Sequence, residues 1–107
     1  MSLAERRKGK TGELEVAALI RDHGFRARRD GRLDTDLDTD LESTHVEIKR
    51  TERPRLDAYC QQAEHDAEKH GKRTWAIFWR SSRRPWVVIL PAEEYLRLRV
   101  IEAERQG

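Results

Sequence analysis

The sequence has little cysteine: Cys60 is the single one in 107 residues. One cysteine excludes an internal disulfide and cannot by itself anchor a thiolate zinc site, and the four histidines lack the spacing of zinc ligands. We therefore interpret Cys60 as a small helix residue. No apolar run approaches the roughly 18 residues that a membrane span needs, and no basic-then-apolar leader is present. These absences predict a cytoplasmic protein with neither a membrane span nor a secretion signal.

The sequence also lacks a low-complexity linker, a glycine-rich phosphate loop and any internal repeat beyond a doublet of Asp-Thr-Asp-Leu. A length of 107 residues supports one domain with a modest core. We predict a single domain over residues 1–107, in which residues 1–10 form a basic, partly frayed arm. Because hydrophobic residues make up 36% and charged residues 39%, this domain should be globular but unusually polar.

Acidic residues are concentrated in the stretch 34–50, which holds six of them before its first basic residue. The whole chain has 20 acidic and 22 basic residues, so removing these six leaves 14 acidic against 22 basic. A cationic surface around a carboxylate cluster suits an enzyme of nucleic acids, because the periphery binds phosphates while a bound metal neutralises the cluster.

The second half of this stretch alternates apolar and charged residues from Val46 to Lys49. We predict a strand whose apolar side is buried and whose Glu47 and Lys49 share the solvent-exposed face. Asp36 and Asp38 alternate in the same phase, so a hairpin turning at residues 41–44 would place an aspartate opposite Glu47. Paired carboxylates of this kind favour Mg²⁺ or Mn²⁺, and the lysine can position the attacking water or neutralise charge on a phosphate. The alternative is a solvated edge hairpin whose charges only prevent aggregation.

The same residues also allow a calcium-binding alternative, because Asp36, Asp38, Asp40 and Glu47 stand at positions one, three, five and twelve of an EF-hand loop. Two features argue against a calcium module. Leu41 occupies position six, where the sharp turn needs glycine, and a proline interrupts the segment that should form the exiting helix.

The remaining periodicity predicts the order helix, strand, strand, strand, helix, strand, strand, helix. The first helix should run over 11–23, capped by Thr11 and closed by Gly24. Strands are predicted at 25–29, 75–79 and 86–90, the last two buried, and helices at 56–70 and from 92 onward. The three tryptophans offer more aromatic surface than so small a core readily encloses. Either some of them face outward as a dimer interface, or the flanking helices cover all three.

Four motifs follow one another along the predicted elements. They are Lys8-Gly9-Lys10-Thr11-Gly12-Glu13, Val46-Glu47-Ile48-Lys49-Arg50, Gln62-Ala63-Glu64 and Arg83-Arg84-Pro85-Trp86. In this order they resemble the PD-(D/E)XK nuclease superfamily and, within it, the Holliday-junction-resolvase-like endonucleases of archaea and phages. The similarity spans nearly the whole chain. It implies a restriction-endonuclease-like α/β fold, a mixed β-sheet flanked by helices, and a Mg²⁺- or Mn²⁺-dependent endodeoxyribonuclease acting on DNA such as four-way junctions.

The resemblance also implies site residues. Glu13, an aspartate and Glu47 would bind the metal, Lys49 would stand at the attacking water, and Gln62 matches a downstream glutamine of the phage-type members. The Pro-Asp of the family is absent, so Asp36 and Asp38 both stay open as the aspartate. The implied catalytic set is Glu13, Asp36, Glu47, Lys49 and Gln62, and the implied metal set is Glu13, Asp36, Asp38, Glu47 and Ile48.

Basic residues around this site are predicted to bind DNA phosphates. Because symmetric cutting of a junction needs two active sites, this function predicts a homodimer. A catalytically silent relative that only binds nucleic acid is the main alternative. The predicted DNA contacts are Lys8, Lys10, Arg29, Arg50, Arg53, Arg80, Arg83 and Arg84.

Overall fold

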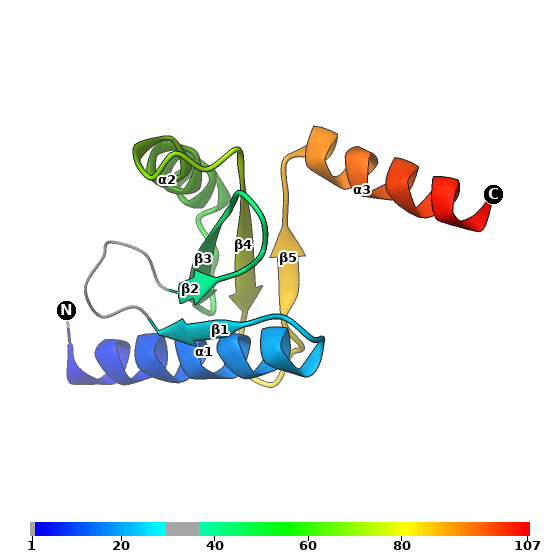
Figure 1. Cartoon of the computed structure of the whole chain (residues 1–107). Coiled ribbons are helices and arrows are strands. Elements are labelled where there is room, and N and C mark those ends of the chain that lie inside the picture. Colours follow the sequence, from blue (N-terminus) through cyan, green and yellow to red (C-terminus); the bar gives the residue numbers. More distant parts are fainter. Residues whose placement is uncertain (1, 30–36) are drawn as a thin grey trace.

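The computed structural model describes residues 2–29 and 37–107, and Figure 1 shows the elements of these two ranges. Their order confirms the predicted fold class, a mixed α/β fold. Asp36, one of the two candidate aspartates, lies outside the described residues. The elements are α1 (Leu3–Asp22), β1 (Ala27–Arg29), β2 (Leu37–Thr39), β3 (Thr44–Arg50), α2 (Leu56–Lys69), β4 (Thr74–Arg80), β5 (Val87–Ile89) and α3 (Ala92–Gln106).

The larger sheet has the strand order β3-β4-β5. β3 and β4 are parallel, and α2 forms the crossover that a parallel pair requires, whereas β4 and β5 are antiparallel. The register places Glu47 beside Ile77 and Lys49 beside Trp79. Successive side chains of a strand point to opposite faces, so Val46 packs with α1 while Ile77 packs with α2. The two helices therefore cover opposite faces of β3 and β4.

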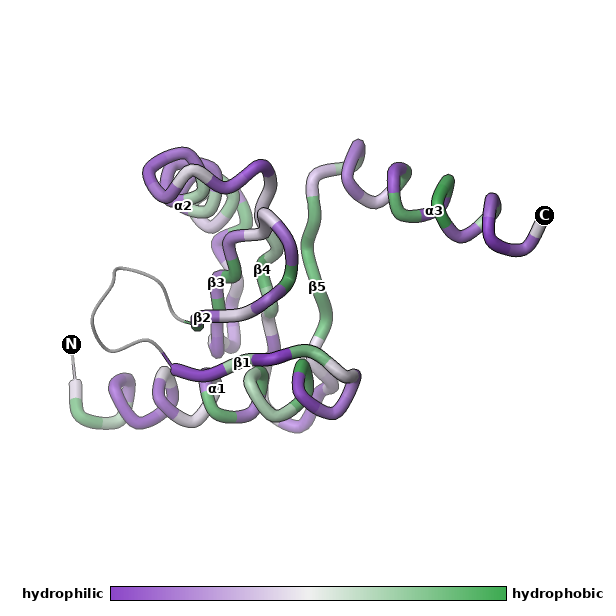
Figure 2. The backbone as a smooth tube through the Cα atoms, viewed as in Figure 1, coloured by the Kyte–Doolittle hydropathy of each residue, from purple (hydrophilic) through white to green (hydrophobic). Residues whose placement is uncertain are grey.

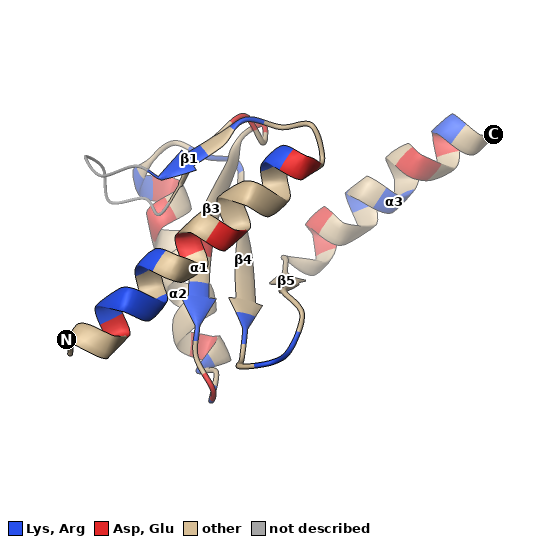
Figure 3. Ribbon diagram, turned by 90° about the horizontal axis from the view of Figure 1, so that it is seen from below, with Lys and Arg blue, Asp and Glu red and all other residues tan. Residues whose placement is uncertain are grey.

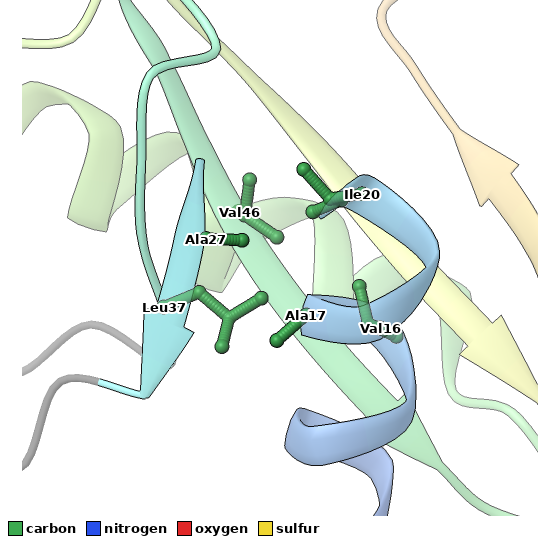
Figure 4. Close-up of a cluster of buried hydrophobic side chains, with 6 residues drawn as sticks. All are labelled: Val16, Ala17, Ile20, Ala27, Leu37 and Val46. Atoms are coloured by element: carbon green, nitrogen blue, oxygen red, sulfur yellow. The ribbon is translucent and has the colours of Figure 1, made fainter. Parts of the chain in front are cut away.

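The core consists of one cluster on each face of this sheet. Figure 4 shows the first cluster, where side chains from α1, β1, β2 and β3 converge. The second lies under α2 and contains Tyr59, Ala63 and Ile77. Full burial of a valine or isoleucine side chain contributes about 1.5–3 kcal/mol, so these clusters fix both helices against the strands. The first cluster is Val16, Ala17, Ile20, Ala27, Leu37 and Val46.

Helix α1 begins at Leu3, eight residues before the predicted start, so the basic arm predicted to be frayed is helical. Its cap is Ser2, whose Oγ accepts a hydrogen bond from the amide of Glu5 at 3.1 Å. Thr11 is an exposed helix residue instead of the cap. The helix continues through Gly12, whose missing side chain lets α1 approach β3: an added Cβ would lie 3.4 Å from Ile48.

The predicted hairpin between β2 and β3 is wrong for the described residues, because β2 pairs antiparallel with β1. Opposite charges explain this choice. Arg28 and Asp38 face each other in register and form an ion pair at 3.3 Å, and the amide of Arg26 donates to Asp40 at 2.8 Å. The EF-hand alternative fails as well, because the segments that should be its helices contain the strands β1 and β3.

Strand β5 lies at the sheet edge and is not buried as predicted: Val87 and Val88 are 44% and 45% exposed. Helix α3 does not cover it, because α3 extends away from the rest of the molecule (Figure 1). Figure 2 shows apolar residues along β4 and β5 and a mixture along α3. The three tryptophans are half-buried, with two packed against α2 and one against the α1 cluster. No helix in the described ranges is long and apolar enough to cross a membrane.

Candidate active site

The face of β3 that meets α2 carries three polar side chains, His45, Glu47 and Lys49. They alternate along the strand, so Glu47 and Lys49 lie on one face as their spacing requires. That face is not open to solvent as predicted, because α2 packs on it. Glu47 is only 4% exposed, His45 2%, and Lys49 is half-buried.

Helix α2 meets this strand with a matching polar face formed by Tyr59, Gln62 and Asp66, which are spaced three and four residues apart. Lys49 Nζ donates to Gln62 Oε1 at 2.7 Å and lies 5.1 Å from the centroid of the Tyr59 ring. The Tyr59 hydroxyl in turn lies 2.8 Å from Thr51 Oγ1. These contacts hold the ammonium group of Lys49 in place.

Deeper under α2, a histidine and two carboxylates come together. His45 Nε2 lies 2.7 Å from Glu47 Oε1 and 4.0 Å from Asp66 Oδ2, and the three side chains offer ligand atoms that all lie within 4.8 Å of one another. The ring of His70 stacks on that of His45 with centroids 5.9 Å apart. Sequence reasoning missed His45 and Asp66. The available signal was that His45 precedes Glu47 by two residues and Asp66 follows Gln62 by four, so each shares a face with a candidate.

The other predicted metal ligands within the described residues do not join this cluster. Glu13, on α1, accepts a hydrogen bond from Arg29 Nε at 2.5 Å, and Asp38 pairs with an arginine of β1. Gly12 of α1 lies against Ile48, on the face of β3 opposite Glu47, and the Ile48 side chain packs with the α1 cluster. The described residues therefore do not gather Glu13 and Asp38 around Glu47.

The comparison with solved structures decides the fold. The chain has a resolvase-like fold. It superposes on Hjc from Archaeoglobus fulgidus, a Holliday junction resolvase from an archaeal hyperthermophile, with a TM-score of 0.60 and 18% sequence identity. The match covers 78% of this chain and 72% of that chain. No family model and no curated protein matches the sequence.

In this resolvase-like fold, the carboxyl ends of β3 and β4 meet at one edge of the sheet, because the two strands are parallel. Arg50 and Arg80 end the two strands in register, and Figure 3 shows basic residues there and along the first turns of α1. The predicted DNA contacts that are exposed at this end come from α1 and from the loops that follow β3 and β4. They are Lys8, Lys10, Arg53, Arg83 and Arg84.

Glu52 joins the three segments of this basic end. Its carboxylate lies 3.6 Å from Lys8 Nζ and accepts a hydrogen bond from the Ser82 amide at 3.1 Å. The hydroxyl of Ser82 also donates to it, and these bonds, with Lys8, lower the pKa of the Glu52 carboxyl below its usual value. The loop after β3, the loop after β4 and α1 are thus connected at this edge.

Two of the arginines among the predicted DNA contacts are held by glutamates. Arg80 donates to Glu15 Oε2 at 2.8 Å, and the indole of Trp86 donates to the same oxygen at 3.0 Å. Arg29 is held by Glu13. Arg50 has a buried Nε with no hydrogen-bond partner among the described residues. Phosphate contacts are therefore more accessible to the exposed lysines and arginines of the basic end than to these three arginines.

Proposed function

We propose that the protein is a metal-dependent endonuclease of the PD-(D/E)XK type that hydrolyses phosphodiester bonds in branched DNA, four-way junctions included. One observation carries this proposal: Glu47 and Lys49 lie side by side on β3, with Lys49 bound to Gln62, in a fold similar to that of a Holliday junction resolvase. The similarity of fold supports the substrate class only by analogy, and the residue pair supports the chemistry.

The donor chemistry of the site suits a divalent cation, since Glu47 and Asp66 bring carboxylate oxygens within 4.8 Å of each other. A bound divalent ion would polarise a phosphoryl oxygen and lower the pKa of a bound water. Asp36, outside the described residues, is our candidate for a further carboxylate ligand. The role of Glu13 as a metal ligand stays a prediction, and it requires the Glu13 carboxylate to break its hydrogen bond with Arg29.

Lys49 supplies the positive charge that this chemistry needs near the scissile phosphate. Its ammonium group is preoriented by the Gln62 amide and the Tyr59 ring, so it need not reorganise as negative charge develops on the phosphoryl oxygens. Gln62 is exposed, which leaves this end of the site accessible to a DNA backbone.

The basic end of the sheet provides the binding surface for the DNA arms. Arg53, Arg83 and Arg84 are exposed there, close along the chain to the strand ends that carry Lys49 and Arg80. Contacts of this kind attract phosphates without reading sequence, which suits recognition of DNA shape.

A second candidate is a relative that binds branched DNA without cutting it. The burial of Glu47 and its hydrogen bond to His45 favour this alternative, because both restrict access of an ion and a phosphate to the carboxylate.

Linear, nicked, flapped and four-way DNAs of matched sequence, incubated with Mg²⁺ or Mn²⁺, test both functions. The endonuclease should cleave the four-way DNA faster than the linear duplex. Tight binding of four-way DNA without cleavage in either metal would support the silent relative. Absence of both binding and cleavage would contradict both.

We also propose that the protein is a homodimer, because one chain offers one such site and symmetric cutting needs two. Exposed apolar side chains on β5 and α3 supply surface for an interface, in place of the half-buried tryptophans. Sedimentation at micromolar concentration should give twice the monomer mass. A protein that stays monomeric after four-way DNA is added would rule out the junction-resolving activity, and a simple nuclease activity would remain possible. The exposed side chains are Val87, Val88, Tyr95, Leu96, Leu98 and Val100.

A further inference from the structure

We infer that His45, Glu47 and Asp66 form a binding site for a first-row transition-metal ion of the Zn²⁺ class, in preference to Mg²⁺. The inference deepens the proposed function and in part rests on it, because it assigns Glu47 to a particular class of ion. Binding of the ion itself is measured without DNA, so it can stand or fail independently of cleavage.

The geometry of the three donors suits a small ion. Zn²⁺ holds nitrogen and oxygen ligands at about 2.0–2.2 Å in a tetrahedral arrangement, which keeps the donors about 3.4 Å apart. His45 Nε2 is 2.7 Å from the Glu47 oxygen and 4.0 Å from the Asp66 oxygen, on either side of that spacing. Because all three donors lie within 4.8 Å of one another, small side-chain rotations are enough to surround an ion. Three protein ligands also leave a fourth position for water.

The balance of charge points to a divalent cation. The side chains of Glu47 and Asp66 are only 5% and 16% exposed, and two carboxylates so placed need positive charge nearby. A protonated His45 would balance only one of them. Lys49, the next residue on the same face, donates to Gln62. A divalent ion with neutral His45 balances both carboxylates.

The orientation of His45 is compatible with the same assignment. The side chain of His45 is 1% exposed, and its Nε2 is the ring nitrogen that lies near both carboxylates. Ligation through Nε2 places the proton of His45 on Nδ1, which has no hydrogen-bond partner among the described residues.

The nature of the donors sets the preference among ions. Imidazole nitrogen suits Zn²⁺ and its neighbours, whereas Mg²⁺ takes oxygen ligands and retains several waters. A set with one nitrogen and two carboxylates should therefore bind Zn²⁺ more tightly than Co²⁺, Co²⁺ more tightly than Mn²⁺, and Mg²⁺ least.

The test is calorimetric titration of the chelator-treated full chain with Zn²⁺ and with Mg²⁺ in the absence of DNA. We expect one equivalent of Zn²⁺ and an affinity for Mg²⁺ at least about 100-fold lower. Asp66→Asn and His45→Asn should each lower the Zn²⁺ affinity at least about tenfold. Loss of a residue that only supports a ligand lowers metal affinity by about that factor, and loss of the ligand itself should lower it at least as much. His65→Asn is the matched control, because His65 is an exposed histidine of the same helix.

Asp66→Asn decides the outcome if His45→Asn does not fold, since Asp66 lies at the rim of the site. The inference is overturned if the wild-type chain binds no stoichiometric Zn²⁺, if Mg²⁺ binds as tightly, or if Asp66→Asn retains wild-type affinity. Cleavage of four-way DNA in any of those cases would leave the endonuclease standing. Zn²⁺ binding that depends on Asp66, without cleavage of any DNA, would support the metal site and contradict the proposed endonuclease activity.

Discussion

The carboxylate of Glu94 links helix α3 to the residue before β4. Glu94 is the only buried residue of α3, all of which is described. It accepts hydrogen bonds from Arg73, which precedes β4, at 2.8 and 3.1 Å, and from Arg97 at the same two distances. The bonds from Arg73, followed by those from Arg97, lower the pKa of Glu94 from 4.5 to about 2. We predict that Glu94→Gln releases α3.

The size of the effect follows from the pKa of Glu94. The difference between 4.5 and about 2, at about 1.4 kcal/mol for each pKa unit, sets an upper limit of roughly 3–4 kcal/mol. Both arginine side chains are 48% exposed, so solvent screening reduces this to about 2 kcal/mol. Because an isolated helix of this length is marginally stable in water, a released α3 should also unfold.

Hydrogen exchange of the α3 amides measures the release. At pH 7, Glu94→Gln should reduce their protection about 30-fold, which corresponds to 2 kcal/mol, and leave β3 and β4 unchanged. Glu93→Gln is the matched control, since Glu93 is exposed and lies in the same helical turn. A lowered carboxyl pKa contributes stability above pH 4.5 that is lost as the pH falls toward 2. The difference between wild type and Glu94→Gln should therefore close over that range.

Two results would refute this reasoning. Equal loss of α3 protection in Glu94→Gln and Glu93→Gln would show that helix-terminal charge, and not the arginine pair, holds the helix. A difference between wild type and Glu94→Gln that persists unchanged at pH 2 would show that the ionised carboxylate is not the source of the stability.

Two further predictions concern the proposed nuclease. Lys49→Ala should lower the single-turnover cleavage rate at least about 100-fold and DNA affinity by less than threefold, because the ammonium acts on charge that develops in the transition state. The control is Lys72→Ala, which changes an exposed lysine between α2 and β4. A proportional loss of affinity in Lys49→Ala would make Lys49 a phosphate anchor. Arg84→Ala should weaken binding to all DNAs alike and reduce the slope of log affinity against log salt concentration by about one. Arg105→Ala on α3 is the control and should change neither. A loss of affinity for one DNA shape alone would contradict a phosphate contact.

The order of helices and strands could be predicted because the periodicity of nearby residues in the sequence indicates each element. Helix α2 occupies nearly the predicted range, and its buried residues Tyr59, Ala63 and Ala67 recur at helical spacing. The start of α1 could not be predicted, because Gly9 and Gly12 indicate a break that tertiary packing overrides: Gly12 is buried against Ile48 and Trp86.

Pairing and burial depended on distant residues and were predicted less well. The alternation of Asp38 and Asp40 fitted a partner on either side, and Arg26 and Arg28, just before and within β1, decided it. The burial of Glu47 follows from α2 packing on the charged face of β3, where Asp66 and Gln62 provide polar partners. A period-two pattern shows which residues share a face, but it does not show which face a helix covers. For the same reason His45 was not recognised as a companion of Glu47.

The central claim is that Glu47 and Lys49 form a centre for metal-dependent DNA cleavage, and Glu47→Gln tests it most directly. Glutamine preserves an acceptor for the hydrogen bond from His45 and removes the charge, and the fold of the variant is verified by circular dichroism, because Glu47 is buried. Glu64→Gln, an exposed glutamate of α2, is the control. The decisive measurement is the single-turnover rate on four-way DNA with Mg²⁺ or Mn²⁺. We predict that Glu47→Gln binds the DNA but does not cleave it while Glu64→Gln cleaves normally; undiminished cleavage by a folded Glu47→Gln variant would contradict the claim.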